Sequence, residues 1–246
     1  EIMKKQKFTI GTDPEFFLQS QETQEFVPAS MFFLEHNKDN PKDFGGGFGV
    51  LRDNVMVEFN VPPANSKDEF IANIYQGIDL IRREIPENID FKFQASAEFS
   101  KEDLKNYAGG LEFGCSEYFN VYNIAIPNPK RTNTRFAGGH IHVGMPTKMT
   151  DEDLERVVKI FDYNLAVPSF EMDKDEERRK YYGTPGCFRI TPYGFEYRSL
   201  SNFWLAGGDL INWVYDQVEL SVNQFYEGVV ISAEQVLQSI ELKEQV

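Results

Sequence analysis

The residues best suited to chemistry form one short run, Ala137-Gly138-Gly139-His140-Ile141-His142-Val143-Gly144. The chain has three histidines, and two of them, His140 and His142, stand two residues apart in this run. If the run is a strand, which Ile141 and Val143 favour, side chains alternate between its two faces. Both imidazoles then share one face, while Ile141 and Val143 point into a core. Taken alone, the pair is also consistent with two histidines on the protein surface.

The same spacing of polar side chains recurs in three other segments. The pairs are Asp13 and Glu15, Glu58 and Asn60, and Glu196 and Arg198. An ordinary half-buried strand also alternates polar and apolar residues, but its polar positions are usually Lys, Thr, Ser or Gln. Carboxylates, imidazoles and a guanidinium occupy these positions here. We therefore predict that four strands place them on one floor that binds metal and phosphate, with Val57, Ile141 and Tyr197 facing away.

This combination of residues indicates a particular class of chemistry. Carboxylates with one or two imidazoles make an oxygen-rich site suited to Mg²⁺ or Mn²⁺, whereas zinc would be expected with more His or Cys. Arginine adds bidentate recognition of phosphate or carboxylate. Metal and arginine together serve phosphoryl transfer. The same parts suit a metallohydrolase, but the arginines favour phosphoryl transfer. No Ser-His-Asp or Cys-His arrangement is evident, and a role for Cys115 stays open.

The composition limits the possible partners and compartment. A net charge of −14 argues against nucleic acid, because phosphate backbones require a basic surface. A nucleotide substrate remains compatible with this charge if cations mediate the contact. No run is apolar enough to span a bilayer and no signal peptide is evident, so we expect a cytoplasmic protein without a membrane partner. Cys115 and Cys187 are expected to be free thiols in a reducing compartment.

Periodicity and capping residues predict an α+β fold with mainly antiparallel strands and helices on one face. We expect a single domain over residues 1–246, because no linker or repeat interrupts the chain. Expected strands cover residues 8–18, 54–61, 91–95, 137–144 and 195–198. Capping residues predict helices that begin after Ser66, Ser100, Thr150 and Ser232 and one that opens at Asp209, with Pro86 ending the first.

Three segments fall outside this regular pattern. The glycine run at residues 45–49 lacks the Lys-Ser/Thr of a P-loop, so we expect a mobile flap or a turn there. Residues 111–130 are expected to form an insert rich in loops. The charged run at residues 173–182 is expected to be a solvated face, or to bring Arg178 and Arg179 over a site.

Several short motifs follow one another along residues 8–205. They are Gly11-Thr12-Asp13-Pro14-Glu15-Phe16, Val57-Glu58-Phe59-Asn60, Gly114-Cys115, Ala137-Gly138-Gly139-His140-Ile141-His142, Tyr182-Gly183 and Glu196-Tyr197-Arg198-Ser199-Leu200-Ser201-Asn202-Phe203-Trp204. In this order they resemble the phage carboxylate–amine (COOH-NH2) ligase type 2 family. That family belongs to the glutamine synthetase-like amidoligases, which are related to glutamate–cysteine ligase.

The resemblance implies a curved antiparallel sheet like the glutamine synthetase catalytic domain, with helices packed on its convex face. Its concave face would bind ATP and two or three divalent cations, Mg²⁺ or Mn²⁺. ATP would phosphorylate the carboxylate of a small molecule or peptide, and an amine would displace the phosphate to form an amide. The separate N-terminal domain of glutamine synthetase is lacking, which leaves the oligomeric state open. The acid and amine substrates are also open, and a phage-encoded protein would act in the host cytoplasm.

The resemblance also implies roles for individual residues. The implied metal ligands are Asp13, Glu15, Glu58, His140 and Glu196. Arg198 would meet the transferred phosphate, with Arg189 and Arg179 as further catalytic candidates. The candidates for ATP contacts are His142, Asn60 and Arg198, and His142 is alternatively a contact to the substrate or a support for a metal ligand. Two other functions remain open: an inactive binding or structural module of the same fold, and a guanidino or carboxylate kinase.

Overall fold

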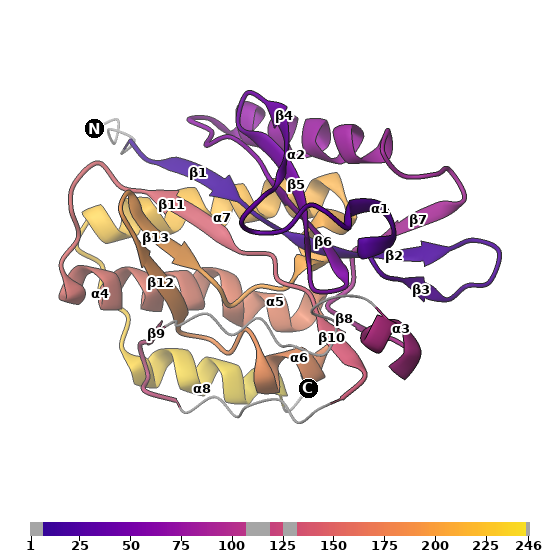
Figure 1. Cartoon of the computed structure of the whole chain (residues 1–246). Helices are drawn as coiled ribbons and strands as arrows, with labels where there is room; N and C mark the ends of the chain where they lie inside the picture. Colours follow the sequence, from indigo (N-terminus) through magenta and orange to yellow (C-terminus); the bar gives the residue numbers. More distant parts are fainter. Residues whose placement is uncertain (1–6, 107–118, 125–131, 245–246) are drawn as a thin grey trace.

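The computed structural model describes residues 7–106, 119–124 and 132–244 of the chain. Among these residues, the strands form two main antiparallel sheets that lie side by side (Figure 1). The first has the strand order β1-β11-β13-β12-β9. Its strands are β1 (Thr9–Thr12), β11 (Ile141–Gly144), β13 (Gly194–Tyr197), β12 (Cys187–Thr191) and β9 (Phe119–Asn120).

The second sheet has the strand order β3-β2-β6-β5-β4, and β7 also pairs with β2. Its strands are β3 (Phe26–Val27), β2 (Glu15–Ser20), β6 (Met56–Asn60), β5 (Phe48–Asp53), β4 (Lys42–Gly45) and β7 (Ile89–Lys92). A separate pair joins β8 (Ser96–Glu98) to β10 (Thr134–Phe136). Gly45, Gly46 and Gly47 have φ angles of 82°, 65° and 89°, a left-handed region that favours glycine. Of the two forms expected for the glycine run, the structure therefore contains the turn, between β4 and β5.

The two sheets meet where the chain passes from β1 to β2. Proline lacks an N–H group, and Pro14 divides the single strand expected over residues 8–18. Backbone bonds bridge the break: Phe59 N donates to Pro14 O at 3.3 Å, and Glu15 N donates to Gly138 O at 2.9 Å. The strands thus form one curled antiparallel surface of half-barrel shape, which agrees with an α+β fold.

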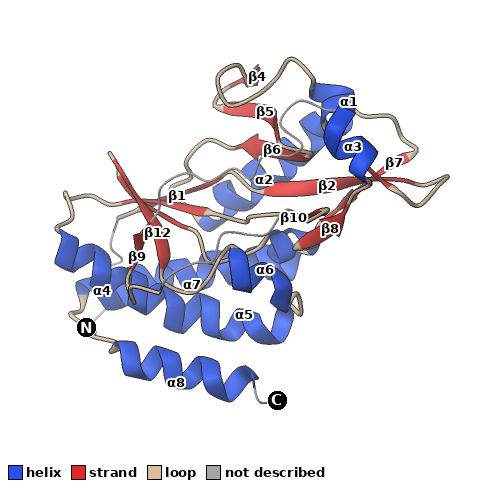
Figure 2. Cartoon of the chain, turned by 60° about the horizontal axis from the view of Figure 1, so that its bottom comes forward, coloured by secondary structure: helices blue, strands red, loops and turns tan. Residues whose placement is uncertain are grey.

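The long helices pack on one face of this surface. Figure 2 shows α4, α5 and α7 along the same side of the strands, with α8 outside them. The larger helices are α2 (Lys67–Arg82), α4 (Asp151–Phe161), the π-helical turn η1 (Asp162–Ala166), α5 (Val167–Met172), α7 (Gly208–Tyr226) and α8 (Ala233–Glu244). Shorter ones are α1 (Ser30–Phe33), α3 (Lys101–Asn106), α6 (Glu176–Tyr181) and the 3₁₀ turn η2 (Asn202–Ala206). In the part of the chain described, no helix is both long and apolar enough to cross a membrane.

The core between sheet and helices follows the predicted alternation. Ile141, Phe195 and Tyr197 are fully buried there, and the ring of Phe161 in α4 lies 5.2 Å from that of Phe195. One short helix departs from the expected single helical layer. Leu104 of α3 joins an apolar cluster with Phe17 on the opposite face of the second sheet. The single-domain organisation of residues 1–246 stays a prediction.

The predicted helix starts agree with the structure. Ser66, Thr150 and Ser232 each accept a hydrogen bond from the backbone N–H three residues later. The helix that begins after Ser66, α2, ends at Arg82, however, several residues before Pro86. The Arg82 guanidinium donates to the carbonyls of Ile85 at 2.9 Å and Ile89 at 2.7 Å, so its side chain stabilises the turn that follows the helix.

Candidate active site

The structure places most of the predicted site residues on one face, in two groups. Asp13, His142 and Glu196 each offer a ligand atom within 4.8 Å of the other two. Glu15, Asp53 and Glu58 do the same. Val57, Ile141 and Tyr197 are fully buried in the core on the other side of the strands, as the alternation predicted. We call the first group the histidine cluster and the second the carboxylate cluster.

Strand register builds the histidine cluster. His142 on β11 lies directly opposite Glu196 on β13. His142 Nε2 is 3.0 Å from Asp13 Oδ1, and its Nδ1 contacts the Tyr193 hydroxyl. Burial alone would lower the pKa of His142, but the charge of Asp13 raises it overall. Asp13 Oδ1 and His142 Nε2 are both buried, so their contact is shielded from water.

His140 stands at the edge of this cluster. Its Nδ1 is 3.3 Å from Glu196 Oε1 and 3.7 Å from Asp13 Oδ1, and its Nε2 is 3.0 Å from the Tyr182 hydroxyl. Burial and the charge of Arg198 hold the pKa of His140 well below its usual range. The imidazole is therefore neutral, the form that can ligate a metal ion.

Close backbone packing fixes the position of His140. The preceding residue, Gly139, donates its N–H to Leu200 O at 3.0 Å. A Cβ atom at Gly139 would lie 2.2 Å from the carbonyl oxygen of Ser201, so only glycine fits there. The His140 carbonyl accepts a hydrogen bond of 2.6 Å from the Thr12 hydroxyl. The glycines before the two histidines thus let this segment approach the loop after β13.

Two arginines surround Glu196, which is 1% exposed. Arg189, opposite Glu196 in the register of β12 and β13, places Nη1 3.0 Å from Glu196 Oε2. Arg198 contacts the other carboxylate oxygen and donates from Nη2 to the Tyr182 hydroxyl at 2.9 Å. Burial would lower the pKa of Arg198, but Tyr182 and Glu196 raise it overall, so the guanidinium stays charged. Two of the three predicted arginines, Arg189 and Arg198, therefore lie on the same floor as the histidine cluster.

The carboxylate cluster lies on the neighbouring sheet. Glu15 on β2 pairs with Glu58 on β6, and Glu15 Oε2 accepts a hydrogen bond of 2.6 Å from Gly138 N. Burial, with the nearby charge of Asp53, raises the pKa of Glu15 to about 8. Burial and the charge of Asp13 raise the pKa of Glu58 well above its usual range.

One lysine enters the carboxylate cluster. Lys38 Nζ is 2.9 Å from Asp53 Oδ2 and 4.0 Å from Glu58 Oε2. Burial would lower the pKa of this ammonium, but the charges of Asp53 and Glu58 raise it overall. Among the residues that the structure describes, the ammonium group of Lys38 thus approaches two of the three carboxyl groups in the cluster.

Both clusters fit a hard divalent cation. The carboxylate cluster supplies only oxygen ligands, and the histidine cluster supplies two carboxylates with an imidazole, which are donor sets for Mg²⁺ or Mn²⁺. The raised pKa of Glu15 reflects burial and repulsion that a bound cation would offset. The buried ligand atoms of Asp13 and His142 also lie 3.0 Å apart. The predicted ligand set is therefore divided between two positions.

Other predicted residues lie elsewhere. Arg179 donates to the carbonyl of Asp173 at 2.8 Å, and its guanidinium lies 4.3 Å from the centre of the Phe170 ring, so its side chain contacts the end of α5. The structure does not bring it to either cluster. Asn60 is half-buried on β6, on the same face as Glu58 and opposite Gly49.

The two cysteines have different outcomes. Cys187 is a buried free thiol, and burial raises its pKa to about 12, which leaves little thiolate for nucleophilic attack. Cys115 and most of the expected insert at residues 111–130 lie outside the described residues.

Asp53 and Lys38 are functional candidates that the sequence reasoning missed. Asp53 is the last residue of β5, and Asn54 follows with a φ of 57°. The Asp-Asn pair before an alternating strand was an available signal of a tight hairpin. Pairing of Asp53 with Met56 then places its side chain on the Glu58 face. Lys38 belongs to a polar segment without periodicity, and no sequence signal connects it to the site.

A known protein family matches the part of the chain that carries the histidines and the arginines of this site. Residues 125–229 match the family model of phage phiEco32-like COOH.NH2 ligase-type 2. The predicted resemblance is thereby confirmed over this segment. The match includes the histidine cluster residues His142 and Glu196 and both arginines of the floor, Arg189 and Arg198.

The name of this COOH.NH2 ligase family describes an enzyme that joins a carboxylate to an amine. The carboxylate cluster lies before the matched segment, so its place beside the matched residues comes from the structure alone. No curated protein sequence matches the chain significantly.

Proposed function

We propose that the chain is an ATP-dependent carboxylate–amine ligase whose curled sheet is a catalytic floor of the glutamine synthetase type. The observation that carries this proposal is that two clusters able to offer ligands to a cation lie on one face with two arginines. The ligase family match over residues 125–229 supports the same reaction class. Small-molecule or peptide carboxylates and amines are the substrates that this reaction requires.

Two divalent cations, Mg²⁺ or Mn²⁺, would bind at the two clusters. Asp13, His142 and Glu196 would hold one, with His140 Nδ1 directed toward the same carboxylates. The carboxylate cluster would hold the other. When bound, such cations neutralise the triphosphate and stabilise charge on the transferring phosphoryl group. Without them, a chain with a net charge of −14 would repel ATP.

The proposed reaction has two steps. In the first, a carboxylate oxygen of the substrate forms a bond to the γ-phosphorus, the bond from that phosphorus to the β,γ-bridging oxygen breaks, and ADP leaves. In the second, the amine nitrogen bonds to the acyl carbon and inorganic phosphate leaves with its oxygen. The amine gives up a proton, and an amide results.

The two floor arginines suit the first step. A guanidinium presents two N–H groups in a plane and can hold two oxygens of a phosphate. Arg189 and Arg198 both contact Glu196, so their positions are already defined before substrate binds. Preorganised donors of this kind stabilise charge that develops in the transition state.

The test is ADP release from Mg²⁺-ATP with a panel of carboxylic acids, in the presence of hydroxylamine. Hydroxylamine converts an acyl phosphate into a hydroxamate, which is measured directly. We expect hydroxamate with the correct acid, and an amide when the hydroxylamine is replaced by the correct amine. Hydroxamate without amide for any amine would indicate a carboxylate kinase. ADP release no faster than that of Glu196→Gln across the panel would favour the inactive binding module.

A further inference from the structure

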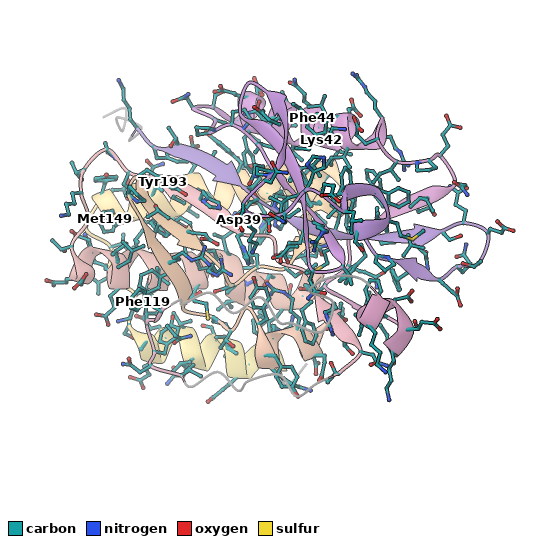
Figure 3. The ribbon with its side chains drawn as sticks, in the orientation of Figure 1. Asp39, Lys42, Phe44, Phe119, Met149 and Tyr193 are labelled. Carbon is teal, nitrogen blue, oxygen red and sulfur yellow. The ribbon has the colours of Figure 1, made fainter. Side chains whose placement is uncertain are left out.

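Lys38 enters the carboxylate cluster from a short ordered turn. Asn37 and Asn40 pair as an isolated bridge, and the Asn37 side chain accepts a hydrogen bond of 2.9 Å from Asp39 N. The turn is fastened to β5, because Arg52 N donates to His36 O at 3.0 Å. Figure 3 labels Asp39, the neighbour of Lys38, near the centre of the molecule. The turn is thus attached to the strand that carries Asp53.

The partners of this ammonium differ in exposure. The Lys38 side chain is 60% exposed, whereas those of Asp53 and Glu58 are 18% and 10% exposed. The carboxylates are fixed on paired strands, while the lysine reaches them from solvent on a flexible stem. Exposed ion pairs of this kind are weak and are easily exchanged. A divalent cation that binds three carboxylates at once would displace a single ammonium group.

We propose that Lys38 occupies the position of the divalent cation at the carboxylate cluster, is displaced when that cation binds, and then contacts a phosphate group of ATP. The proposal rests on the proposed function for its last step. The fastened turn keeps the displaced ammonium at the rim of the cluster. Once a cation has neutralised the carboxylates, the triphosphate held by that cation is the anion within reach. Lysine binds phosphate well as a compact point charge.

A simpler role predicts a different result. If Lys38 served only to neutralise the carboxylates, its removal would strengthen cation binding and leave ATP binding unchanged. Displacement followed by phosphate contact predicts opposite effects on the two ligands. Lys38→Met should bind the cation more tightly and ATP more weakly. These opposite changes in cation affinity and ATP affinity distinguish the proposed role of Lys38 from simple neutralisation of the carboxylates.

Lys42→Met is the matched control. Lys42 lies four positions along the chain, pairs with Glu84 and stands 5.6 Å from the Phe44 ring, away from the carboxylate cluster. Figure 3 labels Lys42 and Phe44 side by side. Its substitution removes the same charge from the molecule without touching the cluster. Lys38→Arg keeps the charge at position 38, and circular dichroism melts verify that each variant is folded.

The first measurement is Mn²⁺ binding without nucleotide, followed by electron paramagnetic resonance. For Lys38→Met we expect one class of Mn²⁺ sites to tighten about fivefold, the size of a partly exposed ion pair. Lys42→Met and Lys38→Arg should match the wild type. Equal Mn²⁺ affinities in Lys38→Met and the wild type would overturn the displacement. If the wild type bound no Mn²⁺, the metal part of the proposed function would fall together with the role of Lys38.

The second measurement is ATP binding by calorimetry at saturating Mn²⁺. We expect Lys38→Met to bind ATP about tenfold more weakly, the loss of one charged contact to phosphate. Lys42→Met should again match the wild type. Tighter Mn²⁺ binding with unchanged ATP affinity would overturn the phosphate contact, while the two cation sites and the ligase proposal would stand.

Discussion

Cation binding at the carboxylate cluster should release protons near neutral pH. Burial and Asp53 raise the pKa of Glu15 to about 8, so its carboxyl is about 90% protonated at pH 7 and about 10% at pH 9. A metal ion binds the ionised carboxylate, and the proton must leave. Glu15 alone should therefore release about 0.9 protons per cation at pH 7. Glu58, whose pKa is also raised, adds to this number.

The assay is calorimetric titration with Mn²⁺ in several buffers of different ionisation enthalpy at one pH. The slope of observed heat against buffer enthalpy gives the number of protons released. We expect a slope near one or above at pH 7 and a smaller one at pH 9. Between pH 6 and pH 8 the apparent affinity should rise by about tenfold per pH unit for each proton released. Glu15→Gln should lower the slope by about 0.9 at pH 7, whereas the exposed Glu22→Gln should not change it. Cation binding without proton release at pH 7 would show that Glu15 is already ionised or is not a ligand.

Three further perturbations have defined outcomes. Because the pKa of Glu15 is raised from 4.5 to about 8, its contribution to the stability of the metal-free fold is present at low pH and is lost as the pH rises through this range. In thermal melts, the wild type should therefore lose stability relative to Glu15→Gln between pH 4.5 and pH 8. Parallel stability curves for the two proteins would contradict this. Arg198→Lys should slow ADP release about a hundredfold, because lysine cannot reproduce the planar two-point contact with phosphate. The control Arg179→Lys should release ADP at nearly the wild-type rate. Equal rates for Arg198→Lys and the wild type would show that Arg198 does not stabilise the transferring phosphate. The carboxylate of Asp162, buried beneath the floor, accepts hydrogen bonds of 2.7 Å and 2.8 Å from the hydroxyls of Tyr197 and Tyr122. Asp162→Asn should therefore lower the free energy of unfolding, measured in urea, by about 2 kcal/mol. An unchanged urea midpoint would contradict this.

The orientation of the floor residues could be predicted because it is local. In a strand, one apolar face fixes where every second side chain points, so Ile141 and Tyr197 determine the side on which His142 and Glu196 lie. Capping residues similarly fixed the start of α2 after Ser66.

The division of the ligands into two clusters could not be predicted in this way. It depends on the break at Pro14, which places Asp13 with one sheet and Glu15 with the other. It also depends on the turn that carries Lys38, whose contacts with Asp53 and Glu58 join segments distant in sequence. Pairing between such segments is set by tertiary packing and not by periodicity.

The directions in which the arginines of α6 point could not be predicted, because the helix is short. Neighbouring helical residues point about 100° apart, and a helix of six residues gives no apolar stripe to fix its rotation. Arg178 is buried and donates to the carbonyls of Ser199 and Leu200, whereas Arg179 turns towards Phe170. The sequence could not show which of the two faces the loop after β13.

The most direct test of the cation floor is calorimetric titration of ATP into the wild-type protein with Mg²⁺ and again after complete chelation. We predict saturable ATP binding with Mg²⁺ and no measurable binding after chelation. Glu58→Gln and Glu196→Gln, which each remove one ligand from a different cluster, should both weaken the Mg²⁺-dependent binding. Equal ATP affinity with and without the cation would contradict it.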